Sequence, residues 1–126
     1  MKLRIKGSSL RLRLTQGEIR ALAEGRTVQE EVPFGPGSAL LYRLRRDAGI
    51  PLITASYSNN VIEIRVPESD ALRWCGSELV GLEQTQPVTG GALRIALEKD
   101  YACLAPREGE DESDNFPHPQ TGTLKC

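Results

Sequence analysis

The sequence repeats itself with a period of roughly fifty residues, and this repeat limits the possible folds more than any other feature. Residues 10–14 alternate apolar and charged side chains, and residues 62–66 alternate in the same way. Each run follows a shorter alternating run and a pair of turn residues, Gly7-Ser8 in the first half and Asn59-Asn60 in the second. Alternation with period two is typical of half-buried strands, and both residue pairs suit two-residue turns. Each half is therefore predicted to open with a β-hairpin.

A short helix is predicted after each hairpin. Thr15 and Glu18 have the spacing of a capping box, in which a hydroxyl and a carboxylate satisfy the free amides at a helix start. In the second half the helix is expected to start near Pro67, to bury Trp74 and to stop at Gly76. Trp74 aligns with Leu22 of the first half, so both side chains are predicted to lie in the core.

Two more strands are predicted to close each half, and the turns between them are rich in proline and glycine. The predicted strands are residues 27–32 and 39–47 in the first half, and residues 79–84 and 92–100 in the second. The fold class expected is α+β: a mainly antiparallel sheet or partial barrel of about eight strands with two short helices, built from two ββαββ pseudo-repeats. We expect one domain over residues 1–104, with repeat halves at about 1–49 and 50–104.

The alternating pattern stops after Leu104, and residues 105–126 are expected to form a flexible acidic tail. Residues 106–114 are polar, acidic and nearly free of apolar side chains, so burial cannot offset the entropy cost of ordering them. Removing this tail is expected to leave the stability almost unchanged. An acidic run that leads into Phe116 and two prolines also has the composition of a docking motif, so a protein partner that binds through the tail is one hypothesis.

Composition limits the class of protein and its surroundings. The chain has 126 residues, 39% hydrophobic and 26% charged, which is ordinary for one soluble globular domain. No secretory signal or membrane-spanning segment is recognised, and three widely spaced cysteines do not suggest a disulfide framework. A cytoplasmic location is therefore expected, with no membrane association. Up to Cys103, 14 Lys and Arg face 12 Asp and Glu, a balance of +2 that argues against nucleic acid as a partner.

Basic side chains opposite the apolar side of the strands are the first candidate for a binding site. Eight Lys and Arg residues occupy such positions, among them Arg4 and Lys6, with Glu31, Glu63 and Glu98 between them. On an open sheet they would form an exposed face with cross-strand ion pairs. In a barrel they would line a charged interior suited to phosphate groups. The candidate ligand-binding residues are Arg11, Arg13, Arg43, Arg45, Arg65 and Arg94.

Metal and catalytic sites find little support in the sequence. The only soft metal ligands are Cys75, Cys103, His118 and Cys126, and no two of them have the close spacing of structural zinc sites. His118 is the only histidine and lies between two prolines in the expected tail, and no glycine-rich phosphate loop links a strand to a helix. No catalytic residue, metal site or cofactor is predicted.

Two resemblances accompany these observations. An eight-stranded barrel lined with charged residues is similar to the tunnel-type triphosphate hydrolases, but the first strand here reads KLRIK where that family has alternating glutamates and a lysine. That likeness is architectural only. The segments MKLRIKG (1–7), LRLRLT (10–15), LEKDYACL (97–104) and FP (116–117) resemble a family of short bacterial proteins of unknown function. This second resemblance implies a bacterial cytosolic origin and no known activity.

The function expected from the sequence is a non-enzymatic binding or regulatory module for a protein or a small anionic ligand. The alternative is an enzyme or binder of phosphate or polyphosphate substrates that uses the arginine-rich strand face. The two hypotheses differ in their response to phosphates, because a ligand that binds only the native state raises the melting temperature.

Overall fold

The order of helices and strands repeats the pattern ββαββ twice, as the sequence predicts. The structure is a computed structural model that describes residues 1–101 and 113–117. In the first half the elements are β1 (Lys2–Lys6), β2 (Ser9–Leu14), α1 (Gln16–Ala23), β3 (Val28–Gly35) and β4 (Ser38–Asp47). In the second half they are β5 (Thr54–Ser58), β6 (Val61–Pro67), α2 (Glu68–Cys75), β7 (Gly81–Val88) and β8 (Gly91–Lys99).

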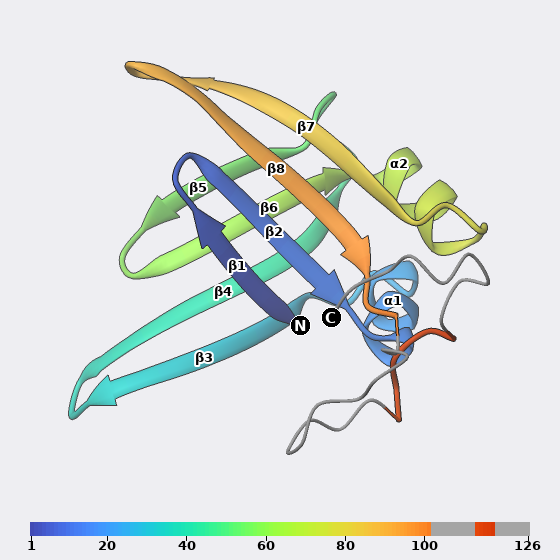
Figure 1. Cartoon of the computed structure of the whole chain (residues 1–126), viewed down its shortest axis with the longest axis horizontal. Helices are drawn as coiled ribbons and strands as arrows, with labels where there is room; N and C mark the ends of the chain where they lie inside the picture. The colour runs from blue at the N-terminus through green and yellow to red at the C-terminus, as the bar shows by residue number, and fades with distance from the viewer. Residues whose placement is uncertain (102–112, 118–126) are drawn as a thin grey trace.

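The strands form two four-stranded sheets, and each sheet takes one hairpin from each half. Sheet A has the order β1-β2-β8-β7, and sheet B has the order β3-β4-β6-β5. The hairpins themselves are antiparallel, while β2 pairs in parallel with β8 and β4 pairs in parallel with β6. Sheet A lies in front of sheet B in Figure 1, and the two helices lie together at one end of the sheets. The halves are therefore interleaved and do not form separate lobes.

This arrangement refines the predicted architecture. The α+β class with eight strands and two short helices is confirmed, but the strands divide between two open sheets, and those that the structure describes close no barrel. The six candidate arginines therefore lie on two outer faces, and the alternative of a charged barrel interior is wrong. The apolar residues of each strand point inward, between the sheets.

The core fills the space between the sheets at the end where the helices lie. Leu12, Leu14, Ile64, Val66 and Leu97 from the strands are fully buried. The helices contribute Leu22 and Trp74, both 0% exposed, as the aligned halves predict. The Trp74 indole N–H also donates a hydrogen bond to the Val80 carbonyl oxygen at 3.1 Å. Burial and this polar contact together fix α2 against the sheets.

Local sequence signals place the turns and helix ends. Thr15 and Glu18 form the predicted capping box at the start of α1. Asn59 and Asn60 have φ angles of 51° and 62°, as a two-residue hairpin turn with two left-handed residues requires. Gly25, just beyond α1, has φ of 86°, a conformation that glycine adopts without a steric cost.

Two strands run further than the sequence predicts. The turns expected at residues 33–37 and 87–91 are shorter, because β3 includes Pro33 and Phe34 and β7 includes Pro87. Both strands lie at the edge of their sheet, where proline is tolerated because a nitrogen that faces away from the neighbouring strand has no ladder hydrogen bond to lose. The two hairpins therefore project beyond the rest of the molecule, at the end opposite the helices (Figure 1).

Five residues of the expected tail, 113–117, lie against the domain. The Asp114 carbonyl oxygen accepts the Gln16 amide at 3.0 Å, and the Phe116 amide donates to the Asp100 carbonyl oxygen at 2.7 Å. Asn115 is 7% exposed, and the Phe116 ring centroid lies 5.4 Å from that of Tyr101. This short segment thus joins the N-terminal end of α1 to the end of β8. The rest of the expected tail lies outside the described residues.

The two helices are short, with eight residues each. Within residues 1–101 and 113–117, neither helix is long and apolar enough to cross a bilayer.

Candidate anion-binding face

The six predicted site residues lie on two opposite faces, three on each. Arg11, Arg13 and Arg94 belong to the outer face of sheet A, and Arg43, Arg45 and Arg65 belong to the outer face of sheet B. The two groups are separated by the core, because their strand neighbours point inward. A small ligand cannot contact all six arginines at once. The ion pairing on each face is therefore described separately.

On sheet B the arginines are neutralised by carboxylates of the protein. Glu63 accepts a hydrogen bond from Arg43 Nε at 2.8 Å, and its carboxylate lies 3.4 Å from Arg45 Nε and 3.8 Å from Arg65 Nε. Arg65 also lies 3.3 Å from the Asp47 carboxylate. Burial raises the pKa of Glu63, but the hydrogen bonds and charges of Arg43 and Arg45 outweigh it, so the pKa is lowered. This face is a satisfied ion-pair network.

On sheet A, ion pairing covers only the end of the face nearest the helices. Arg11 and Arg13 share the Glu98 carboxylate, at 3.5 Å and 3.3 Å. Lys2 lies 3.1 Å from Asp100. Towards the hairpin tips lie three further basic residues, Arg4, Lys6 and Arg94, and no carboxylate among the described residues comes within 4.0 Å of their charged groups.

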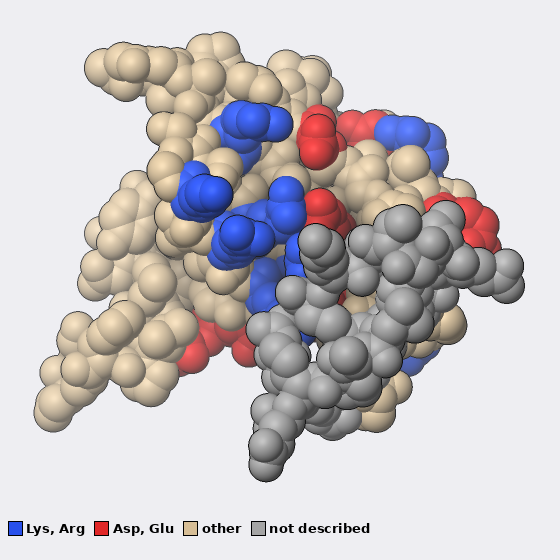
Figure 2. Space-filling view, in the orientation of Figure 1, with Lys and Arg blue, Asp and Glu red and all other residues tan. Residues whose placement is uncertain are grey.

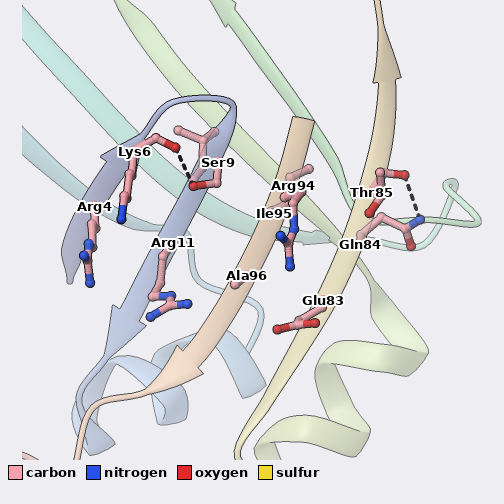
Figure 3. A pocket seen from close by; sticks show the side chains of 11 residues that line it. Arg4, Lys6, Ser9, Arg11, Glu83, Gln84, Thr85, Arg94, Ile95 and Ala96 are labelled. Atoms are coloured by element: carbon pink, nitrogen blue, oxygen red, sulfur yellow. Dashed lines mark hydrogen bonds between the residues drawn. The ribbon is translucent and has the colours of Figure 1, made fainter. Parts of the chain in front are cut away.

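The uncompensated basic residues surround a hollow of about 290 Å³ on this face (Figure 3). Its walls are long basic side chains, while its floor carries small ones. In the register of the sheet, Arg94 lies beside Ser9 and opposite Thr85, and Arg11 lies beside Ala96. The lining comprises Arg4, Lys6, Ser9, Leu10, Arg11, Glu83, Gln84, Thr85, Arg94, Ile95 and Ala96. Short residues between long ones therefore create the depression.

The charge of the hollow is strongly positive. Four basic side chains line it, against the single carboxylate of Glu83. Arg4 and Arg11 are directly opposite each other on β1 and β2, where like charges repel. Glu98 lies 3.5 Å from Arg11, but Arg4 has no carboxylate within 4.0 Å among the described residues. Figure 2 shows Lys and Arg side chains gathered at the centre of this face, over β1, β2 and β8. This cluster is the part of the described surface best suited to a negative ligand.

The chemical groups in the hollow favour binding over catalysis. Guanidinium groups bind phosphate and carboxylate oxygens with two parallel N–H donors, and an ammonium group adds a mobile third contact. The Ser9 hydroxyl donates a hydrogen bond to the Lys6 carbonyl oxygen at 2.7 Å. Elsewhere, burial raises the pKa of the Cys75 thiol, so this cysteine is a weak nucleophile. Within the described residues no group of three or more His, Cys, Asp or Glu could hold a metal ion.

Sequence reasoning identified part of this site and missed part of it. Of the six candidates, Arg11 and Arg94 line the hollow. Arg4 and Lys6 were recognised as strand-face residues but were left out of the candidate set. Their alternation and the Gly7-Ser8 turn, which pairs Arg4 with Arg11, are the signals that could have included them. Arg13 belongs to the same face but is engaged by Glu98.

The hypotheses of a metal site, of catalysis by a Cys–His pair and of a docking motif in the tail concern residues that lie largely outside the described part of the chain. Cys103, His118 and Cys126 fall outside it, and so do residues 108–112 of the acidic run 108–114, which with residues 115–119 has the composition of a docking motif. Of the acidic tail residues, only Asp114 is described. Its carboxylate accepts the Gly17 amide at 3.3 Å, at the start of α1.

Comparison with known proteins gives a family and no named relative. The sequence model of a family of unknown function (DUF7009) matches residues 1–120. No curated protein and no solved structure gives a significant match to the chain.

Proposed function

The chain belongs to DUF7009, a family of unknown function, and we propose that it is a non-enzymatic binding module that holds a small anionic ligand on the outer face of sheet A. One observation carries the proposal. Arg4, Lys6 and Arg94 surround a hollow of about 290 Å³ and have no carboxylate partner among the described residues. An anion there would relieve the repulsion between neighbouring cations.

The contrast between the two sheets supports this choice of face. On sheet B, three arginines converge on the Glu63 carboxylate, with Nε to oxygen distances of 2.8, 3.4 and 3.8 Å. In the aligned halves, Arg11 occupies the position of Glu63. On sheet A the carboxylate of Glu98 takes the corresponding role, at 3.5 Å from Arg11 and 3.3 Å from Arg13, but it forms no ion pair within 4.0 Å with Arg4, Lys6 or Arg94. An external phosphate or carboxylate would supply the negative charge that these three residues lack.

The alternative is an enzyme that acts on phosphate or polyphosphate substrates at the same hollow. Such an enzyme needs a group that activates a nucleophile, and most phosphoryl-transfer sites also hold divalent metals through carboxylates. Glu83 is the one carboxylate in the lining, so the hollow is better equipped to bind than to hydrolyse. Hydrolysis of tripolyphosphate by the purified protein would favour the alternative.

A thermal-shift titration tests the proposal. Orthophosphate, pyrophosphate and tripolyphosphate are added at constant ionic strength, and the melting temperature is followed. At a ligand concentration about 100 times the dissociation constant, the native state gains about 2.7 kcal/mol. We expect the melting temperature to rise with at least one of these anions, and the rise to be reduced in Arg4→Gln and Arg94→Gln.

Arg26→Gln is the matched control for that experiment. It removes the same charge from a residue beyond α1 that is paired with Glu24 and does not line the hollow. The proposal fails if the melting temperature does not respond to any anion. It also fails if the control loses as much of the response as the two hollow variants, because the effect would then be one of overall charge.

We also propose an origin for the repeat, a cellular location and a second partner. The two ββαββ halves descend from an internal duplication, which the matching element orders and the exchange of equivalent hairpins between the sheets support. The protein acts in a bacterial cytoplasm, which the odd number of widely spaced cysteines supports. The second partner that we propose is a basic protein surface, which would bind through the acidic run 108–114.

A further inference from the structure

A second hollow opens between the two sheets, at the end away from the helices. Its volume is about 390 Å³, within the range of small-molecule sites in proteins. Inward-facing residues of both sheets line it: Leu10 and Leu93 from sheet A face Leu40 and Ile62 from sheet B. The remaining lining residues are Ala55, Ser56, Tyr57, Gln86 and Val88. We call this space the inter-sheet groove.

The fold leaves the groove open because the helices cover only the other end. Leu22 and Trp74 fill the space between the sheets near α1 and α2, while the hairpin tips project freely (Figure 1). Two large apolar side chains are left accessible at the groove mouth, with Tyr57 65% exposed and Val88 42% exposed. The groove is thus a continuation of the core that residues 1–101 and 113–117 do not fill.

The groove favours an apolar occupant. The one amide side chain in its lining, that of Gln86, is already engaged with the backbone of Ala55. It accepts the Ala55 N–H at 2.7 Å and donates to the Ala55 carbonyl oxygen at 3.0 Å. These bonds tie β7 of sheet A to the edge of β5 in sheet B and hold the groove walls together. A ligand therefore gains mainly from burying hydrocarbon.

The groove and the anion-binding hollow lie on opposite sides of the same stretch of sheet A. Ser9 and Arg94 face the hollow, while their neighbours Leu10 and Leu93 line the groove. The sheet also narrows there, since β2 begins at Ser9 whereas β8 begins further out, at Gly91. Beyond the Gly7-Ser8 turn, residues 91–93 of β8 have no β2 neighbour and form a strand edge between the two sides of sheet A. Leu10 lines both spaces.

We infer that the anionic ligand is a free single-chain amphiphile, with a carboxylate or phosphate head held by Arg4, Lys6 and Arg94 and an aliphatic chain that passes the β8 edge into the inter-sheet groove. This inference rests on the proposed anion-binding function. Charge complementarity carries it, because the cations without a carboxylate partner among the described residues lie on the same stretch of sheet A whose inner side lines the apolar inter-sheet groove.

Calorimetric titration of the whole chain tests the inference with three probes: decanoate below its micelle concentration, butanoate, and decanol below its solubility limit. Each methylene that leaves water improves affinity about fourfold, so two or more buried methylenes give over tenfold. We expect decanoate to bind at least tenfold more tightly than butanoate and also more tightly than decanol, because only decanoate fills both spaces.

Two variants at exposed positions separate the head and chain contacts. Val88→Glu places a charge at the groove mouth and is expected to weaken decanoate binding at least tenfold while leaving butanoate and phosphate binding unchanged. Arg94→Gln is expected to weaken all three anions. Val80→Glu is the matched control, since Val80 is 49% exposed and does not line the groove. Thermal melts of each variant show whether it is folded.

Each contrary result has a distinct meaning. Equal affinity for butanoate and decanoate would overturn the inference and leave the anion-binding proposal intact. Decanol binding as tightly as decanoate would overturn the role of the basic residues in holding this ligand. Binding to anionic lipid vesicles without binding to free decanoate would assign the surface to a membrane and also overturn the inference. No binding of butanoate, decanoate or phosphate would remove both proposals.

Discussion

Trp74 is the residue on which the core of the second half depends. Its side chain is 0% exposed and its indole N–H is satisfied by the Val80 carbonyl oxygen at 3.1 Å. Trp74→Ala is expected to lower the free energy of unfolding by about 3–5 kcal/mol, because it leaves a large cavity and removes one of the two hydrogen bonds that the Val80 carbonyl oxygen accepts, the other coming from the Lys99 amide. Chemical denaturation measures the loss, and Leu72→Ala on the 46% exposed side of α2 is the control. Equal losses in both variants would contradict the core role.

Glu63 is expected to make stability depend on pH in the acid range. Its pKa is lowered in the folded protein, so its contribution is complete above the ordinary carboxyl pKa of about 4.3 and disappears as pH falls through the lower folded value. Glu63→Gln should therefore be less stable than the wild type at pH 7, and the difference should shrink below about pH 4.

Unfolding by urea at a series of pH values measures this difference. Glu83→Gln is the control, since no Lys or Arg in the described part of the chain lies within 4.0 Å of that carboxylate. A difference between wild type and Glu63→Gln that stays constant from pH 7 to pH 3 would show that the ion pairs of Glu63 do not act as described.

The alternation of apolar and charged residues predicted burial well. It did not predict which charged side chains have an ion-pair partner. Leu22 and Trp74 were placed correctly because helical spacing and the repeat agree on both. Arg43 and Arg94 look equivalent in the sequence, since each lies opposite the apolar side of a strand. Only the pairing of β4 with β6 brings Arg43 to Glu63, and no local pattern encodes which strands become neighbours.

At the scale of single elements, local chemistry predicted starts and turns more accurately than ends. The capping box at Thr15 and the Asn59-Asn60 turn are confirmed, because each is specified by two neighbouring residues. β3 and β7 continue through prolines that usually end a strand. An edge position removes that penalty, and edge positions follow from sheet order, which the sequence does not reveal.

The segment 113–117 is predicted to contribute to stability, unlike a tail without contacts. Its Phe116 ring packs 5.4 Å from Tyr101 and lies 5.5 Å from the Lys99 ammonium. Phe116→Ala is expected to lower the free energy of unfolding by about 1 kcal/mol, the usual size of one aromatic pair with a partly exposed cation–π contact. Denaturant unfolding measures it, with truncation after residue 117 as the control that keeps the segment. If Phe116→Ala has the same free energy of unfolding as the wild type, the contacts of segment 113–117 do not contribute to stability.

For the whole molecule, the exchange of hairpins between halves is the feature that sequence reasoning could not reach. The repeat predicted eight strands, but β2 and β8 are far apart in the chain and pair in parallel without any turn to set their register. A single sheet, a barrel and two sheets all satisfy the same alternation. The two-sheet arrangement buries Leu22 and Trp74 completely, in one core cluster with strand residues of both sheets.

This interleaving predicts how the protein behaves when it is cut between its halves. Residues 48–51 join them, and Ala48 and Gly49 are exposed, so a break there disturbs little packing. Separately produced fragments 1–49 and 50–126 should each lack stable structure as monomers, because either alone leaves the inner strands of its hairpins without their parallel partners. Mixed in equal amounts, they should recover the circular dichroism of the intact chain and a single cooperative melt. Two independent melts, or one fragment that folds fully by itself, would mean that each half is a separate unit and that the parallel pairs β2–β8 and β4–β6 contribute little to the fold.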